Sequence, residues 1–423
     1  MPVGGEFRLQ PRRLQRPPPK STIATPPSTR IIPTAATSTF SSVMMTLRMK
    51  PERTRRITAP RTIMMAPRRA DFRTELFGRT GYLICRARFR AGPSPARWIL
   101  SGLPQANVGA PLTFSIGESG LMVEPQLGMT MDGLIEIARK AEELGFGYIF
   151  RSDHLLPTDE RRGLDSPECW TSLGVLAAST RRIKFGPMVS PIGFRNPAIL
   201  AKMACTIHSA SHGRLQLGVG AGWYAAEYEA HGFPFPDFRT RIAQFAEALA
   251  IVSEMVNRGR VDFTGAYFSA HADCLPRPAG RMHLIVGGRT KPVVRLAGKF
   301  ADEWNTFRIS APDLSGLRRL LQDSAGGRSL EVTEMGPYLV AESETKLEKY
   351  AALHAAALGQ SESPGEIISR MKRRGAPCGT VQEFVDQLRL REDSGFKRVY
   401  FQTLAPRNTE MVELLADTLK GKV

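Results

Sequence analysis

The chain has 423 residues, of which 42% are hydrophobic, so it is long enough for one large domain with a sizeable core and additional segments. Its net charge of +18 is typical of nucleic-acid-binding proteins. However, residues 1–115 hold 20 of the 58 basic residues and only 4 of the 40 acidic ones, whereas residues 116–423 hold 38 basic and 36 acidic residues. This uneven distribution argues against a nucleic-acid-binding role for the larger part of the chain.

Residues 1–115 are predicted to form a disordered extension rich in arginine and proline. They contain 15 of the 31 prolines, and runs such as Pro17-Pro18-Pro19 interrupt every candidate element. No nucleic-acid recognition motif is visible there, so nucleic acid is not expected as a partner. A basic arm that binds nucleic acid or an acidic membrane, a transit peptide and a mis-assigned start of the coding sequence are the alternatives. No apolar run approaches the roughly 18 residues that a membrane span needs, so no membrane anchor is expected.

The five cysteines form no CxxC pair and no spacing typical of metal ligands, and the seven histidines form no HExxH motif. Widely scattered cysteines in odd number are typical of reduced thiols. The sequence therefore predicts a cytoplasmic protein without a metal site.

From about residue 120, short β-rich runs alternate with amphipathic stretches about eight times. The first amphipathic stretch places Leu134, Ile137 and Leu144 on one face, and Gly145 follows as a C-terminal stop signal. The predicted strands are residues 120–124, 148–151, 183–189, 214–219, 284–286, 303–306, a strand near 335–340, and 398–402. Four predicted helices begin at Ser166-Pro167, at Asn196-Pro197, near Phe238 and at the capping box of residues 380–383. Residues 342–374 are also predicted to be helical, with an interruption at 359–365, and residues 408–419 form the last helix.

About eight alternating units over some 290 residues predict an α/β fold, a (β/α)8 TIM barrel. Residues 261–278 are predicted to be an inserted hairpin and loop before strand five. A doubly wound sheet is the alternative. It is disfavoured because the glycine run of residues 218–222 has the spacing GxGxG rather than GxGxxG.

Active sites of such barrels lie where the strands end, so polar residues at strand ends are candidate site residues. Asp153-His154 follows the second strand, and a histidine there can transfer a proton near neutral pH. The structural alternative is that Asp153 caps a loop and His154 binds the backbone.

Two further strand ends carry unusual residues. Gly287-Gly288-Arg289-Thr290 lies between the fifth strand and a helix, where glycines allow close backbone approach and a helix N-terminus favours an anion. A plain tight turn is the alternative. The end of the third strand has prolines on both sides, Pro187 and Pro191, which indicates a bulge.

Several short motifs follow one another along residues 150–305. They are Phe150-Arg151-Ser152-Asp153-His154-Leu155-Leu156-Pro157, Phe194-Arg195-Asn196-Pro197 with Lys202, the run from Ser209 through Gly213-Arg214-Leu215 to Gly222-Trp223, and Val286-Gly287-Gly288 followed by Ala301-Asp302-Glu303-Trp304-Asn305. In order and spacing this set resembles the luciferase-like monooxygenase superfamily, and within it the group of coenzyme F420-dependent oxidoreductases. The resemblance covers about residues 118–405 and does not reach residues 1–115.

The resemblance implies a TIM barrel that binds coenzyme F420 or, as the alternative, FMN. It places Asp153 and His154 facing the ring system, with His154 transferring a proton and Asp153 orienting it. The residues that the resemblance and the strand ends assign to the cofactor are Met188, Val189 and Ser190 in the bulge, Gly220 at the end of strand four, and Gly287, Gly288, Arg289 and Thr290 around the phosphate.

The leading hypothesis is therefore a cytoplasmic oxidoreductase that transfers a hydride between coenzyme F420 and a small organic substrate. An FMN-dependent monooxygenase acting with molecular oxygen is one alternative, and a non-catalytic flavin-binding relative is another. The oligomeric state stays open, with a homodimer as one alternative. The subgroup that oxidises sugar phosphates has Thr-Gly-Glu at the end of strand four. Here Ala221-Gly222-Trp223 stands in its place, which argues against sugar-phosphate oxidation.

Overall fold

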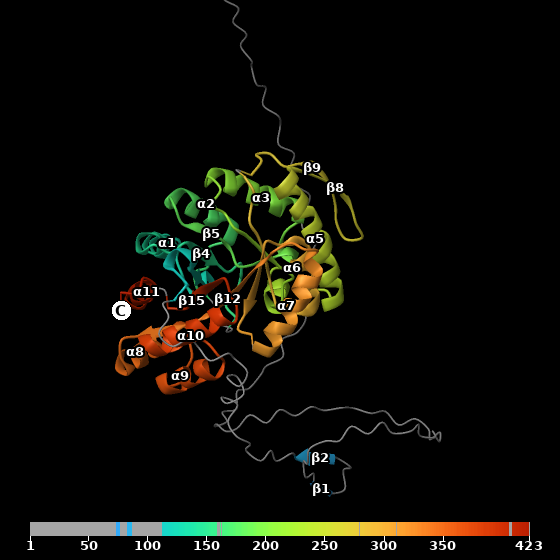
Figure 1. Ribbon diagram of the computed structural model, residues 1–423. Coiled ribbons are helices and arrows are strands. Elements are labelled where there is room, and N and C mark those ends of the chain that lie inside the picture. Colours follow the sequence, from blue (N-terminus) through green and yellow to red (C-terminus); the bar gives the residue numbers. More distant parts are fainter. Residues whose placement is uncertain are drawn as a thin grey trace, which may run out of the picture. The chain divides into compact units, whose positions relative to one another are not determined.

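The computed structural model describes residues 73–76, 83–86, 112–158, 161, 163–278, 280–309, 311–405 and 408–422 (Figure 1). The chain divides into two compact units, Met1–Phe89 and Arg90–Val423. In the first unit, β1 (Arg73–Leu76) pairs with the antiparallel strand β2 (Leu83–Arg86). Most of the predicted extension of residues 1–115 lies outside the described residues.

The second unit contains the predicted barrel. Its parallel sheet has nine strands in the order β5-β4-β3-β15-β12-β11-β10-β7-β6. The two end strands, β5 and β6, follow each other directly in the chain and together form the third strand of the barrel. Because β5 pairs with β4 and β6 pairs with β7, the sheet closes on itself. The strands are β3 (Gly120–Val123), β4 (Tyr148–Arg151), β5 (Lys184–Pro187), β6 (Ser190–Pro191), β7 (Leu217–Gly220), β10 (Leu284–Gly287), β11 (Glu303–Phe307), β12 (Glu331–Pro337) and β15 (Arg398–Thr403).

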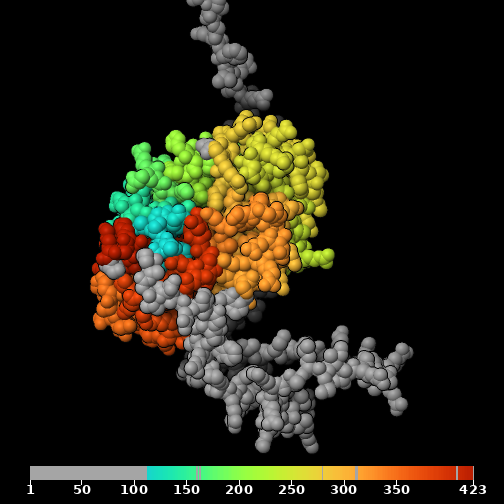
Figure 2. Space-filling model, viewed as in Figure 1, coloured from blue at the N-terminus to red at the C-terminus, as the bar shows by residue number. Residues whose placement is uncertain are grey.

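The first and last barrel strands are neighbours, because β15 pairs with β3. The segments that carry these two strands accordingly meet on the surface, as the cyan and red regions of Figure 2 show. The helices lie outside the sheet (Figure 1). They are α1 (Met131–Leu144), α2 (Cys169–Ser179), α3 (Pro197–Ala210), α5 (Phe238–Arg258), α6 (Lys291–Phe300), α7 (Ala311–Ala325), α10 (Val381–Asp393) and α11 (Thr409–Leu419).

Most helix ends follow the predicted signals. Gly145 ends α1 in the left-handed conformation, with φ of 94°. The Asn196 side chain accepts a hydrogen bond from the Ala198 N–H at the start of α3. Helix α2 is the exception: it was predicted to begin at Ser166-Pro167 but begins at Cys169. The Glu168 carboxylate caps it by accepting from the Thr171 N–H at 2.7 Å.

Two insertions extend the barrel. The predicted one is confirmed: β8 (Arg260–Thr264) and β9 (Ser269–Asp273) form an antiparallel hairpin between α5 and β10, the fifth strand position. The second follows β12 and contains β13 (Leu339–Ala341), α8 (Glu344–Ala357), α9 (Pro364–Arg373) and β14 (Cys378–Thr380). The seventh strand begins at Glu331 instead of near residue 335, because Glu331, Thr333 and Glu334 hide its apolar pattern.

Glu331 and Thr333 belong to a polar network at the N-terminal end of the barrel, whereas Glu334 binds Arg391 of α10. Arg398 donates to Glu331 and to the buried carboxylate of Glu303, and its Nε donates to Glu118 at 3.0 Å. His283 lies 3.1 Å from Glu303. The network closes this end. An apolar layer then fills the barrel interior, formed by Met122, Tyr148, Phe150, Met188, Ile285 and Tyr400. The polar site that we describe next therefore lies at the opposite, C-terminal end.

The packing of the barrel begins before residue 116. Phe114 is 3% exposed and lies in the main apolar core, against which Leu112 also packs. The Phe114 N–H donates to Glu392 Oε1 of α10 at 2.5 Å. Residues 112–115 are thus part of the barrel rather than of the preceding segment. Within the part of the chain that the structure describes, no helix is both long and apolar enough to span a membrane.

Candidate active site

The strand-end residues predicted from the sequence share one rim of the barrel, because all strands of its sheet are parallel. Asp153 and His154 directly follow β4, Ser190 begins β6, Gly220 ends β7 and Gly287 ends β10. This C-terminal rim is therefore the candidate active site.

His154 is bound by a carboxylate that the sequence did not point to. Its Nδ1 lies 3.1 Å from both carboxylate oxygens of Glu227, which is 1% exposed. Glu227 belongs to a short unpredicted helix, α4 (Ala225–Ala230), and also accepts the Leu155 N–H at 3.1 Å. The pair fixes the ring, so that Nδ1 carries the proton toward Glu227 and Nε2 has no hydrogen bond within the described residues.

The surroundings of His154 favour its protonated form. Burial by itself lowers the pKa of His154, but the hydrogen bond to Glu227 and the charges of Glu124, Glu227 and Asp153 outweigh it and raise the pKa above 6.5. Trp223 meets the imidazole edge-on, with ring centroids 5.7 Å apart, and is itself 66% exposed. His154 can therefore exchange a proton with a ligand on the rim near neutral pH.

Asp153 lies at the expected strand end but makes a different contact from the one expected. We expected it to orient His154, but its buried carboxylate binds Arg195 at 2.6 Å and accepts from the Ser190 hydroxyl at 2.7 Å. Ser190 Oγ in turn accepts from Trp170 Nε1 at 2.9 Å. Burial raises the pKa of the Asp153 carboxyl, while the charge and hydrogen bonds of Arg195 oppose that rise. Asp153 thus anchors β6 and the loop that follows it.

The bulge predicted at the end of the third strand position is present. The peptide bond between Met188 and Val189 is cis and separates β5 from β6. A Cβ at Gly220 would lie 2.6 Å from Val189 Cγ2, and a Cβ at Gly287 would lie 2.8 Å from Val189 Cγ1. Both glycines are therefore needed to make room for the bulge residue, and they position the Val189 side chain on the rim.

The predicted phosphate loop opens α6. Gly288 has φ of 136°, which favours glycine, and Thr290 is the N-cap residue. The Gly288 N–H is already bound, because it donates to the Asn305 carbonyl at 3.1 Å. The N–H groups of Arg289 and Thr290 make no backbone hydrogen bond within the described part of the chain. These two groups, with the exposed Arg289 side chain, are the ones available to an anion.

Further guanidinium groups extend this positive region along the rim. Arg308 directly follows β11 and stacks on the Phe307 ring at 4.3 Å, but it makes no hydrogen bond or ion pair among the described residues. Burial lowers the pKa of Arg308, and neighbouring positive charges lower it further, while Glu334 opposes them. The neighbouring charges are those of Arg374, Arg370 and Arg289. An unpaired, partly buried guanidinium in a positive region is suited to bind an anionic ligand.

Sequence reasoning missed Glu227 and assigned no role to Arg195. Glu227 lies 73 residues from His154 in a six-residue helix, too short to give a clear periodic pattern. Arg195 stood in one of the quoted motifs, but its contact with Asp153 depends on how two loops fold. Ala221-Gly222-Trp223 contains no glutamate, but the rim still has a carboxylate in this region. It belongs to Glu227 of α4, which follows these residues.

Sequence comparisons relate the chain to F420-dependent dehydrogenases. The chain is 34% identical over 173 residues to an F420-dependent glucose-6-phosphate dehydrogenase of Intrasporangium calvum, which covers 40% of this chain and 52% of the relative. It is 30% identical over 200 residues to an F420-dependent hydroxymycolic acid dehydrogenase of Mycobacterium tuberculosis, which covers 47% of this chain and 54% of the relative. The chain thus spans about half the length of the curated relatives it matches.

A similar solved structure has the same fold. It is an F420-dependent secondary alcohol dehydrogenase in complex with an F420-acetone adduct, with a TM-score of 0.62 and 19% identity over 72% of this chain and 98% of that one. The model of the family described as luciferase-like monooxygenase matches residues 112–398, which include every candidate site residue named above. The chain therefore belongs to the luciferase-like monooxygenase family.

Proposed function

We propose that this protein is an oxidoreductase that transfers a hydride between coenzyme F420 and a small organic substrate with a hydroxyl or carbonyl group. The observation that carries the proposal is the hydrogen-bonded pair of His154 and Glu227 on the C-terminal rim, next to the bulge at Val189. The relatives support it, because their names give glucose 6-phosphate, hydroxymycolic acid and a secondary alcohol as the compounds on which they act.

The rim has the features that a flavin or deazaflavin needs. The Val189 side chain would contact the ring system, and the N–H groups of Arg289 and Thr290, which make no backbone hydrogen bond among the described residues, would bind a phosphate. FMN ends in a single phosphate, whereas coenzyme F420 carries carboxylates beyond its phosphate. The charge of Arg308, which has no ion-pair partner among the described residues, therefore favours F420 over FMN.

The protein residues would handle the proton. When bound, coenzyme F420 supplies the acceptor for a hydride from the carbinol carbon, or the donor in the reverse direction. In alcohol oxidation the hydroxyl proton passes to Nε2 of His154 as the carbon loses its hydride, which leaves a carbonyl compound. Glu227 stabilises the imidazolium that results, because its carboxylate accepts from Nδ1. In carbonyl reduction His154 returns the proton to the oxygen.

The test is a His154→Ala variant in which turnover, cofactor affinity and melting temperature are measured on one preparation. Turnover per folded molecule should fall by about 10²–10⁴-fold, with the fluorescence titration of F420 nearly unchanged. The melting temperature should fall, because the change leaves the buried carboxylate of Glu227 without its imidazole partner. His271→Ala is the matched control, because His271 is an exposed histidine of the β8–β9 hairpin that binds Asp262. Preserved turnover in folded His154→Ala would refute the role of His154.

The family itself favours a second candidate, since it is described as that of a luciferase-like monooxygenase. An FMN-dependent enzyme acting with oxygen would use the same bulge and phosphate loop. Titration of the protein with F420 and with FMN, followed by measurement of oxygen consumption in the presence of reduced FMN, separates the two. Tighter binding of F420 without oxygen uptake supports the dehydrogenase, and the converse supports the monooxygenase.

A further inference from the structure

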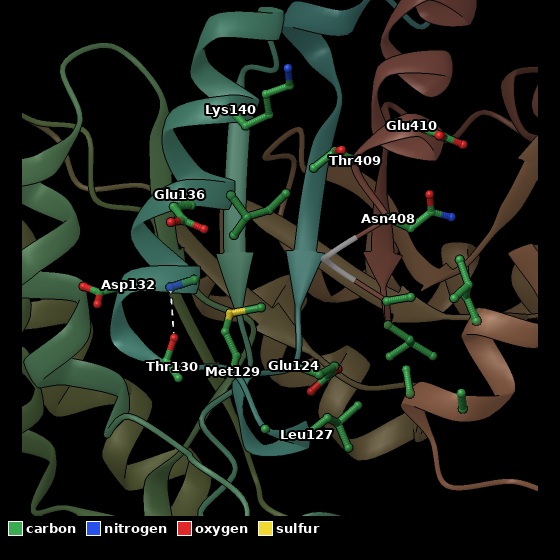
Figure 3. A pocket seen from close by; sticks show the side chains of 18 of the residues that line it. Glu124, Leu127, Met129, Thr130, Asp132, Glu136, Lys140, Asn408, Thr409 and Glu410 are labelled. Carbon is green, nitrogen blue, oxygen red and sulfur yellow. Dashed lines mark hydrogen bonds between the residues drawn. The ribbon is translucent and has the colours of Figure 1, made fainter.

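The groove shown in Figure 3 and a smaller pocket both lie apart from the residues that contact His154. The groove has a volume of about 1220 Å³ and runs along α1. Its lysines are compensated, because Lys140 pairs with Glu413 at 2.5 Å and Lys349 pairs with Glu410 at 3.3 Å. The smaller pocket contains an arginine that has no ion pair among the described residues. It is therefore the pocket in which a negatively charged ligand would gain a partner.

This pocket lies at the N-terminal end of the barrel, opposite the candidate active site. It has a volume of about 370 Å³ and lies between α7 and the residues that precede or begin β12 and β15. Pockets of about 300–1,000 Å³ hold small organic ligands. The charged and polar residues of its lining are Arg318, Gln322, Arg328, Ser329, Glu331 and Lys397.

The side chain of Arg318, on α7, is held in this pocket by packing. Its guanidinium carbon lies 5.5 Å from the centre of the buried Phe396 ring. Gly395 has φ of 77°, and a Cβ there would overlap Nη1 of Arg318. A left-handed glycine thus leaves the space that the guanidinium occupies, so the fold itself fixes the position of this group.

The guanidinium carries an uncompensated charge within the part of the chain that the structure describes. Its Nε and Nη2 atoms are buried and have no hydrogen-bond partner there. Burial lowers the pKa of Arg318, and no described carboxylate opposes that effect. The only carboxylate among the described lining residues, that of Glu331, instead binds Arg398 at 2.7 Å. Removing a charge from water without a partner costs free energy, which a negatively charged ligand would offset.

Other groups around the pocket also suit an anion. Arg328 and Lys397 bring the lining to three positive charges against one carboxylate. Lys397 is exposed and lies 4.0 Å from Glu118, at the limit of an ion pair. The backbone N–H groups of Ser329 and Leu330 make no backbone hydrogen bond among the described residues. Two surplus positive charges match a phosphate monoester, which carries a charge of about −1.5 to −2 at pH 7.

We propose that this pocket binds a small phosphate monoester, at a site separate from the candidate active site. The phosphate accepts hydrogen bonds from the guanidinium of Arg318 and from the N–H groups of Ser329 and Leu330. Lys397 and Arg328 balance the rest of its charge, and the remaining volume holds the organic part of the ester. The site does not depend on the proposed function, because it shares no residue with the C-terminal rim.

Calorimetric titration of the full chain with glycerol 3-phosphate at constant ionic strength tests the site. The ester should bind and glycerol should not, because glycerol lacks the phosphate. Arg318→Met keeps an apolar side chain on Phe396 but removes the charge, and it should weaken binding by about 10–100-fold. Arg318→Lys should retain part of the affinity. Arg319→Met is the matched control, since Arg319 is exposed on the same helix and lies outside the lining.

A second set of measurements separates this pocket from the loop at the start of α6. Arg289→Glu changes that loop and should leave binding of the ester in this pocket unchanged, whereas Arg318→Met should leave F420 binding unchanged. Inorganic phosphate should raise the melting temperature of wild type and Arg319→Met more than that of Arg318→Met. Absence of ester binding, its loss in Arg289→Glu, or equal binding and equal melting shifts in wild type and Arg318→Met would overturn the proposal.

Discussion

At the scale of single residues, the candidate site consists of two carboxylate contacts with different consequences. Glu227 binds a titratable partner, His154, and therefore tunes a proton. Asp153 binds Arg195, which stays charged, and therefore fixes a loop. Asp153, which we predicted to orient His154, is adjacent to it in sequence, but the carboxylate that contacts the imidazole is that of Glu227, which follows another strand.

The pairing with Glu227 predicts how activity depends on pH. Glu227→Gln should lower the pKa of His154, because it removes the charge that raises it. In alcohol oxidation the neutral imidazole is the base, so the rising limb of kcat/KM against pH should move to lower pH. Glu229→Gln, an exposed change on the same helix, is the control. An unmoved limb in Glu227→Gln would show that His154 is not the group that titrates.

The same variant predicts how stability depends on pH. The pKa of His154 is raised in the folded protein, so its pairing contributes stability below the unfolded value of 6.5 and loses it as pH rises through the folded value. Chemical denaturation should therefore show that Glu227→Gln lowers the free energy of unfolding more at pH 5 than at pH 8. Equal losses at both values would contradict a charged pair.

Arg289 provides a test of the phosphate loop. Arg289→Glu should weaken F420 binding by tenfold or more, about 1.4 kcal/mol, since it places a negative charge beside the free N–H groups that open α6. The control is Arg295→Glu, which makes the same charge change at an exposed position within α6, away from its N-terminus. Equal effects of both changes in a fluorescence titration would indicate a general charge effect rather than a site.

At the scale of elements, the two ends of the barrel strands have different tasks. The C-terminal ends of β6, β7 and β10 combine a bulge with glycines, whose missing Cβ atoms leave room for the Val189 side chain. The N-terminal ends of β11, β12 and β15 each begin with a charged residue, Glu303, Glu331 and Arg398, whose side chains bind one another. The network at this end stabilises the fold, because the positive charge of Arg398 compensates the buried carboxylate of Glu303.

This division predicts a large effect of Arg398→Met on stability. The change leaves the carboxylate of Glu303, which is 1% exposed, without its main positive partner. The free energy of unfolding in urea should fall by about 3–5 kcal/mol. Arg258→Met breaks an exposed pair with Glu254 and should cost less than about 1 kcal/mol. Similar losses for the two variants would mean that the network contributes no more than a surface pair.

At the scale of the whole molecule, the excess charge and the barrel belong to different parts of the chain. A shortened chain that begins at Pro111 keeps Leu112 and Phe114 and should fold and bind F420 like the full chain. A chain that begins at Ser115 loses the buried Phe114 and should be less stable by about 3–5 kcal/mol. Thermal denaturation of both measures this difference. A Pro111 chain that is insoluble or cannot bind F420 would show that earlier residues are needed.

The sequence by itself determined the barrel, because its strands, helix caps and stop signals are local patterns with a clear period. It also determined which residues reach the rim, since strand ends in a parallel barrel share one edge. A cytoplasmic location stays a prediction of the sequence, and the oligomeric state stays open.

The tertiary structure alone decided which rim residues touch. The contact of His154 with Glu227 spans 73 residues and that of Asp153 with Arg195 spans 42, and both depend on how irregular loops fold back across the rim. The space that Gly220 and Gly287 leave for Val189 also arises only when separate elements pack. Sequence periodicity records which side of an element is buried, but it carries no information about which distant side chain lies opposite.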